Sequence, residues 1–192
     1  MSGNTHPQSG MTLIELIIVI VIMGIAMTIF TTALIPQIQN ASSFHYQSRA
    51  VSLGQSMMSQ ILARNFDHYV DPNGGLIRCG ETALSAPACR TVLGTDGGET
   101  TPATFNDVDD YIGCWYTDDT KASCTITPHY ELRDILGNDA TNDYRNFRVE
   151  VQVTVSQNSA SGIPKMKRVQ LDVFAGNSTT RTLRLVGYRG NY

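Results

Sequence analysis

A long apolar run near the N-terminus constrains this chain more than any other feature. It extends from Leu16 to Ile35 without a charged side chain, and its only polar residues are three threonines. As an α-helix, a segment of roughly 20 residues is about 30 Å long, which is the thickness of a bilayer's hydrocarbon core. The run therefore predicts a helix that can span a membrane.

The residues around this run separate three interpretations. A secretory signal needs a basic start, an apolar core of about 7–15 residues and a small-residue cleavage site after it. Residues 1–10 contain no lysine or arginine, the apolar run is too long, and no convincing site follows it. A plain membrane anchor fits the length but leaves Glu15 unexplained, because a carboxylate deep in hydrocarbon costs about 2.5–3.5 kcal/mol.

The third interpretation accounts for both the polar leader and Glu15. The sequence GMTLIE, from Gly10 to Glu15, followed by the apolar run, resembles the leader of type IV prepilins. The resemblance implies cleavage after Gly10 and N-methylation of the new N-terminal residue, Met11. It also implies that Glu15, the fifth residue of the mature chain, serves in assembly. Met11 replaces the phenylalanine usual in this family. The leader lacks the usual basic residues, so the orientation of the chain rests on the cleavage motif rather than on the positive-inside rule.

The physical chemistry of Glu15 is consistent with that role. A free amino group on Met11 and a carboxylate on Glu15 are both unfavourable in hydrocarbon. When helices stack with a stagger, the carboxylate of one subunit meets the ammonium group of its neighbour. Breaking such a buried pair is strongly penalised. We therefore expect Glu15 to set the register of the subunits.

The resemblance also implies partners and a location. The expected partners are the prepilin peptidase, other major and minor pilins, the inner-membrane assembly platform, and membrane lipid before assembly. The chain is then expected in the inner membrane with a periplasmic head, and in a cell-surface pilus after assembly.

Residues beyond the apolar run predict the fold. Pro36 is expected to end or kink the helix. Apolar residues then recur at helical spacing, namely Ile38, Tyr46, Ala50, Leu53, Met57 and Ile61. Near the C-terminus, Phe147, Val149, Val151, Val153 and Val155 alternate with polar residues, and two further short alternating segments follow. These patterns predict an antiparallel sheet packed on the helix.

The predicted class is α+β and type IV pilin-like, with a long N-terminal helix packed on a C-terminal antiparallel sheet. Its expected parts are a leader (1–10), a transmembrane or fibre-core helix (11–36), an amphipathic continuation (37–66), a turn-rich disulfide-bearing region (67–143) and a β-meander (144–192).

The four cysteines are all in the turn-rich region. They are Cys79, Cys89, Cys114 and Cys124. An even number behind a membrane-targeting segment indicates two structural disulfides in an oxidising compartment. Of the three possible connectivities, Cys79–Cys89 with Cys114–Cys124 is favoured, because short loops close at low entropic cost.

No constellation of residues points to catalysis, and we expect no enzyme and no cofactor. The acidic cluster of Asp107, Asp109 and Asp110 suggests calcium, but it lacks the glycine and the distal glutamate of an EF-hand loop. A capped or solvated turn is the favoured interpretation. The formal net charge of -3 is too small to indicate a nucleic-acid partner.

Three stretches sharpen the resemblance. They are AVSLGQS from Ala50, DPNGGLIRC from Asp71 and FNDVDDY from Phe105, and they resemble the minor pilins of the mannose-sensitive haemagglutinin (MSHA) type IV pilus. That resemblance implies a minor pilin that initiates or caps a pilus used in attachment. The alternatives are a type II secretion pseudopilin, or a pilus-tip module whose head binds a surface ligand.

Overall fold

The computed structural model describes residues 12–70, 78–81, 85–133, 139–140 and 142–191, with the side chains of all of these except 36–43. The chain forms two units, Met1–His45 and Tyr46–Tyr192. The predicted leader lies outside the described residues, and so do the first seven residues of the stretch DPNGGLIRC that begins at Asp71.

One helix contributes to both units. Helix α1 spans Leu13–Leu62 and includes Pro36, so the proline does not end it. An interior proline costs a helix about 3 kcal/mol, and the long segments on both sides favour helix strongly enough to offset that cost. The apolar run and the amphipathic segment therefore belong to one element.

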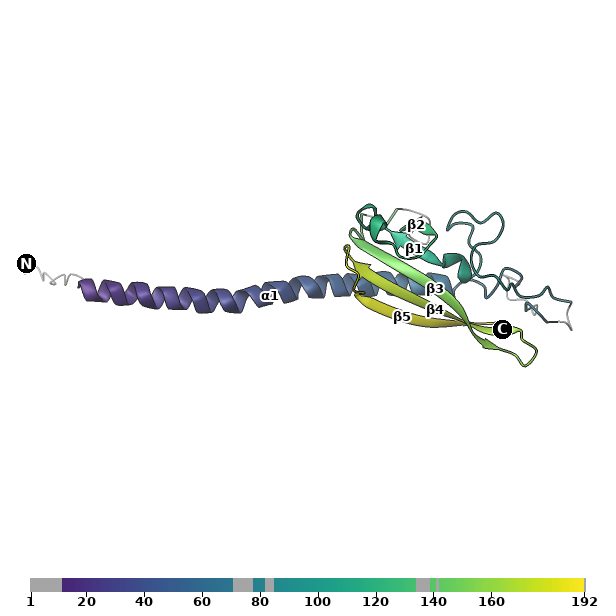
Figure 1. The fold of residues 1–192 in the computed structure, drawn as a ribbon, viewed down its shortest axis with the longest axis horizontal. Helices are drawn as coiled ribbons and strands as arrows, with labels where there is room; N and C mark the ends of the chain where they lie inside the picture. The colour runs from purple at the N-terminus through teal and green to yellow at the C-terminus, as the bar shows by residue number, and fades with distance from the viewer. Residues whose placement is uncertain (1–11, 71–77, 82–84, 134–138, 141, 192) are drawn as a thin grey trace, which may run out of the picture. The chain divides into compact units, whose positions relative to one another are not determined.

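The C-terminal unit contains a five-stranded sheet, formed by β1 (Gly113–Tyr116), β2 (His129–Glu131), β3 (Phe147–Asn158), β4 (Pro164–Ala175) and β5 (Leu183–Gly190). The strand order is β2-β1-β3-β4-β5. Strands β3, β4 and β5 form an antiparallel meander, which the alternating apolar residues predict. The C-terminal part of α1 runs behind these strands (Figure 1).

The hydrophobic core lies between this part of α1 and the sheet. The helix contributes residues at helical spacing, namely Ala50, Leu53, Met57, Met58 and Ile61. The sheet contributes alternate residues of its two long strands, namely Phe147, Val149, Val151, Val153, Val169, Leu171 and Val173. The predicted α+β fold, a long apolar helix packed on a sheet, is therefore confirmed.

Two glycines allow close approach between helix and sheet. A Cβ on Gly54 of α1 would lie 3.0 Å from Cδ1 of Leu185, and one on Gly187 of β5 would lie 2.8 Å from Cδ1 of Leu62. A larger residue at either position would force these leucine side chains to shift.

The sheet differs from the prediction in one respect. It is mixed rather than antiparallel, because β2 pairs in parallel with β1. Both strands come from the region that the sequence predicts to be turn-rich. Strand β1 is only four residues long and buried throughout, so it lacks the polar alternation that reveals a half-buried strand.

Candidate assembly site

The N-terminal half of α1 presents an apolar surface to its surroundings. The segment Leu13–Ile35 has a mean hydropathy of 2.8, and none of its residues is buried against the rest of the described chain. Among the described residues it is the one helix that is long and apolar enough to cross a membrane. A helix with an apolar surface on all sides needs lipid or other helices around it.

The polar groups within this segment are satisfied locally. Thr28 Oγ1 donates to the carbonyl oxygen of Gly24 at 2.8 Å, and Thr31 Oγ1 donates to that of Met27 at 2.7 Å. Thr32 Oγ1 donates to the carbonyl oxygen of Thr28 at 3.0 Å. Each hydroxyl bonds back to the preceding turn, so the threonines leave no donor unsatisfied in an apolar environment.

Glu15 is the exception in this segment, since it alone carries a charge. It lies in the first turn of α1, where its backbone nitrogen and that of Leu16 donate to the carbonyl oxygen of Thr12 at 3.1 and 3.2 Å. The carboxylate is therefore at the positive end of the helix dipole, which stabilises an acid by about 0.3–1 kcal/mol. Gly10 and Met11, the predicted cleavage and methylation positions, lie outside the described residues.

The comparisons with known proteins bear on this same segment. The family model of the prokaryotic N-terminal methylation motif matches residues 5–31. The match includes Gly10, Met11 and Glu15, as well as most of the apolar run. The chain carries the N-terminal motif of the type IV pilin and pseudopilin family. No curated protein and no solved structure gives a significant match to the chain.

The pilin motif sets the general role of the molecule. It indicates a structural subunit rather than an enzyme, processed by a prepilin peptidase and assembled with other pilins. Together with the apolar helix it indicates a chain that is anchored in a membrane before assembly.

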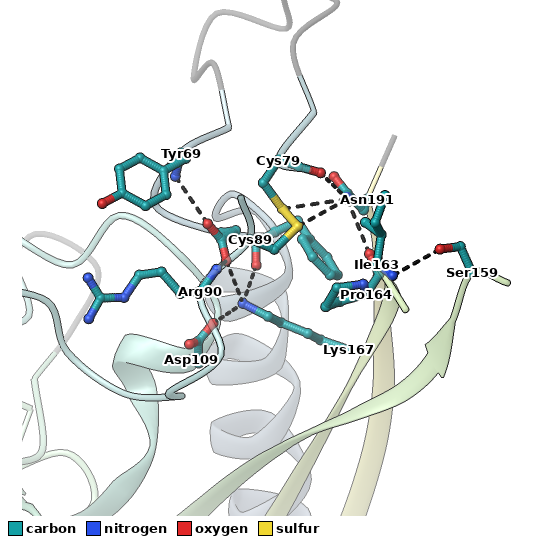
Figure 2. Close-up of a disulfide and its surroundings, with 12 residues drawn as sticks. Tyr69, Cys79, Cys89, Arg90, Asp109, Ser159, Ile163, Pro164, Lys167 and Asn191 are labelled. Atoms are coloured by element: carbon teal, nitrogen blue, oxygen red, sulfur yellow. Dashed lines mark hydrogen bonds and ion pairs between the residues drawn. A yellow bond between two sulfur atoms is a disulfide. The ribbon is translucent and has the colours of Figure 1, made fainter. Parts of the chain in front are cut away.

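Two disulfides hold the turn-rich part of the C-terminal unit, which is called the head below. The structure joins Cys79 to Cys89 and Cys114 to Cys124, which are the pairs that the spacing favours. The first is fixed to the end of the sheet by Asn191, whose Nδ2 donates to the carbonyl oxygens of Cys79 and Pro164 at 3.2 Å each (Figure 2). The second links β1 to the end of a 3-10 helix, η3 (Asp118–Ser123).

A buried ionic centre lies beside the first disulfide. Lys167 of β4 is 1% exposed; its Nζ donates to the carbonyl oxygen of Phe66 at 2.6 Å and to Oδ1 of Asp109 (Figure 2). The same nitrogen lies 3.7 Å from Oδ2 of Asp67. Asp67 also accepts backbone N–H bonds from Tyr69 and Arg90. Lys167 of β4 thus connects the residues just after α1 with Asp109, which lies in the segment before β1.

The acidic cluster that suggested calcium is part of this buried region. Asp107, Asp109 and Asp110 are all at most 2% exposed, so the prediction of a solvated turn is wrong. The alternative of a capped turn is right. Asp110 Oδ2 accepts the backbone N–H groups of Asn106 and Asp107 at 2.8 and 3.0 Å, and Asp107 Oδ1 accepts that of Asp109 at 3.0 Å.

Burial governs the electrostatics of these acids. Loss of solvent, then the neighbouring carboxyl of Asp109, raises the pKa of Asp107 to about 9. Burial likewise raises the pKa of Asp110 to about 7, against the lowering effect of its backbone N–H partners. Near neutral pH the carboxyl group of Asp107 therefore stays protonated and that of Asp110 is partly protonated.

The sequence did not reveal this ionic centre. Its members come from the end of α1, from the loop before β1 and from β4, and charged residues carry no periodic signal that brings such segments together. One clue is Lys167 itself, since it follows the inward-facing side of an otherwise apolar strand, in step with Val169, Leu171 and Val173.

Proposed function

We propose that this chain is a minor type IV pilin of the MSHA class. It is assembled through its N-terminal helix and initiates or caps a pilus used in attachment. The observation that carries the proposal is Glu15, placed five residues after Gly10 within the matched methylation motif and at the start of a helix that the chain itself leaves uncovered.

The same geometry explains how such a subunit would assemble. Cleavage after Gly10 would create an amino group on Met11, four residues before Glu15 in the chain. Within one helix both groups lie at the same end, so the next subunit's helix, displaced along the fibre axis, offers a better partner for each. The apolar surface of Leu13–Ile35 would leave lipid and pack on equivalent surfaces in the fibre.

The head supports a minor rather than a major subunit. The segment between α1 and β3 is long, and it carries both disulfides and the buried ionic centre. A major pilin packs identical heads along the whole fibre, whereas an initiating or capping subunit can carry an individual head. The first stretch that resembles MSHA minor pilins lies in α1, and the other two lie in the segment between α1 and β3.

Deletion of the gene tests the proposal. We expect the number of surface pili to fall at least tenfold, because assembly would lack an initiating subunit, and we expect type II secretion to continue at its normal rate. Pili are counted by electron microscopy after complementation with the wild-type gene as the control. Unchanged pilus numbers together with a secretion defect would instead identify a type II pseudopilin. Normal pili that no longer attach would identify a tip-binding module.

A further inference from the structure

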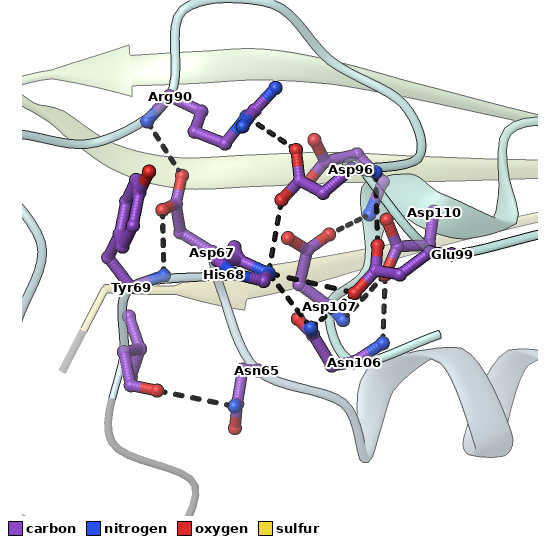
Figure 3. A network of polar contacts seen from close by, with 12 residues as sticks. Asn65, Asp67, His68, Tyr69, Arg90, Asp96, Glu99, Asn106, Asp107 and Asp110 are labelled. Atoms are coloured by element: carbon purple, nitrogen blue, oxygen red, sulfur yellow. Dashed lines mark hydrogen bonds and ion pairs between the residues drawn. The ribbon is translucent and has the colours of Figure 1, made fainter. Parts of the chain in front are cut away.

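A second group of polar side chains consists of His68, Asp96 and Glu99. Nδ1 of His68 is 3.2 Å from Oδ2 of Asp96 and 3.6 Å from Oε1 of Glu99 (Figure 3). These three atoms lie within 4.8 Å of one another. A nitrogen and two carboxylate oxygens therefore converge on a single point from two separate segments of the chain.

The spacing of these atoms matches a metal site. Zinc bonds to histidine nitrogen and carboxylate oxygen are about 2.0–2.2 Å long, and neighbouring ligands of a tetrahedral ion are consequently about 3.3–3.6 Å apart. The two distances from His68 agree with that separation.

Burial leaves this region short of positive charge. The side chains of Asp96 and Glu99 are only 3% and 8% exposed. Arg90 pairs with Asp96 through Nε and Oδ1 at 2.6 Å. Lys167 pairs instead with Asp109 and Asp67. Asp96 and Glu99 thus share one permanent cation, Arg90, and unpaired buried charge is strongly unfavourable.

An independent observation also indicates that a group is missing. The side chain of Asp96 is 3% exposed, yet its Oδ2 has no hydrogen-bond partner. That oxygen is the one that lies 3.2 Å from Nδ1 of His68. A buried carboxylate oxygen without a hydrogen-bond donor indicates a place for a cation beside it.

The neighbouring amide of Asn106 is placed to respond to an ion. Its Nδ2 lies 2.9 Å from Nδ1 of His68 and donates to Oε1 of Glu99. Its Oδ1 is buried and has no partner. A 180° rotation of the amide group would exchange Nδ2 and Oδ1 and direct Oδ1 toward His68 Nδ1 and Glu99 Oε1. The side chain of His68 is 37% exposed, which leaves solvent a path to the site.

We propose that His68, Asp96 and Glu99 bind a divalent transition-metal ion, for which Zn²⁺ is the best match. A histidine nitrogen among the ligands favours zinc over calcium, which takes oxygen ligands. The ion neutralises the surplus acids and fastens the loop that contains Asp96 and Glu99 to the chain just beyond α1. This site is structural, and it uses residues other than the Asp107–Asp110 cluster.

Calorimetric titration of the purified full-length chain in detergent, after treatment with EDTA, tests the proposal. With ZnCl₂ we expect one ion per chain, a Kd of micromolar or tighter, and a rise in the melting temperature. His68→Ala is expected to weaken zinc binding at least 30-fold. The matched control is His129→Ala, which removes an exposed histidine elsewhere in the head and is expected to bind zinc as the wild type does.

Three results would overturn the proposal. One is equal zinc affinity in the wild type and in His68→Ala. Another is tight binding of CaCl₂ that His68→Ala does not change, which would indicate an all-oxygen site. The third applies even if the variant does not fold. X-ray absorption of the zinc-loaded wild-type chain must show one imidazole nitrogen among oxygen ligands, and a shell without imidazole would contradict the assignment.

Discussion

The variant Glu15→Val is expected to be cleaved normally and to enter pili at least about 100-fold less than the wild-type chain. Cleavage depends on residues around Gly10, which the substitution leaves intact. Assembly would lose the partner of the Met11 amino group and leave that charge alone among apolar helices. Breaking one member of a buried pair costs about 3–5 kcal/mol, and each 1.4 kcal/mol is a factor of ten in an equilibrium.

Immunoblots of membrane and sheared-pilus fractions measure both steps. The matched control is Leu16→Val, which changes the neighbouring residue without changing charge and is expected to assemble within about threefold of the wild type. If Glu15→Val were cleaved and then recovered in pili at the wild-type level, the pairing of Glu15 with a neighbouring subunit would be disproved.

The second large effect concerns the stability of the head. Lys167→Met keeps an unbranched apolar side chain, one atom shorter, but removes the ammonium group that contacts Asp109, Asp67 and the carbonyl oxygen of Phe66. The carboxylates would stay buried without their cation. We therefore expect the free energy of unfolding to fall by about 3–5 kcal/mol. Urea denaturation of the detergent-solubilised chain, followed by the fluorescence of Trp115 in the core, measures the change.

Lys165→Met is the matched control for this variant. Lys165 lies on the same strand two residues earlier, and its side chain is exposed. Its substitution is expected to change the free energy of unfolding by less than about 0.5 kcal/mol. A similar, small effect of both substitutions would show that the acids do not depend on Lys167.

Much of the fold could be predicted because its signals are local and periodic. The uncharged run predicts the first half of α1, and apolar residues at helical spacing, such as Leu53 and Met57, predict the face that packs on the sheet. The alternation from Phe147 onward predicts β3. Pro36 does not end the helix, because the cost of one proline is small beside the preference of a 50-residue helix, and the predicted continuation beyond it belongs to the same element.

The remaining features depend on contacts between distant segments. Strand β1 pairs with β3, and its neighbour β2 is only three residues long, so neither shows a pattern of its own. The burial of Asp109 depends on Lys167, which is 58 residues away. The group around His68 includes Glu99, which lies more than thirty positions later in the chain. Such groupings arise from the tertiary fold, and spacing along the chain does not show them.

The assembly motif was predictable for the opposite reason. Cleavage, methylation and pairing are expected of residues within a few positions of one another, so the relation of Gly10, Met11 and Glu15 is visible in the sequence itself. The family model matches the same residues. The matched motif ends at residue 31, so the proposed role as a minor pilin depends on the head, where no such local motif is matched.

Mass spectrometry of pili sheared from the cell surface tests the central claim most directly. We predict that the fraction contains this chain in small amounts relative to the major pilin, and that its N-terminal peptide begins at N-methylated Met11. Recovery of the chain only in membranes, with Met1 through Gly10 still attached, would contradict the account.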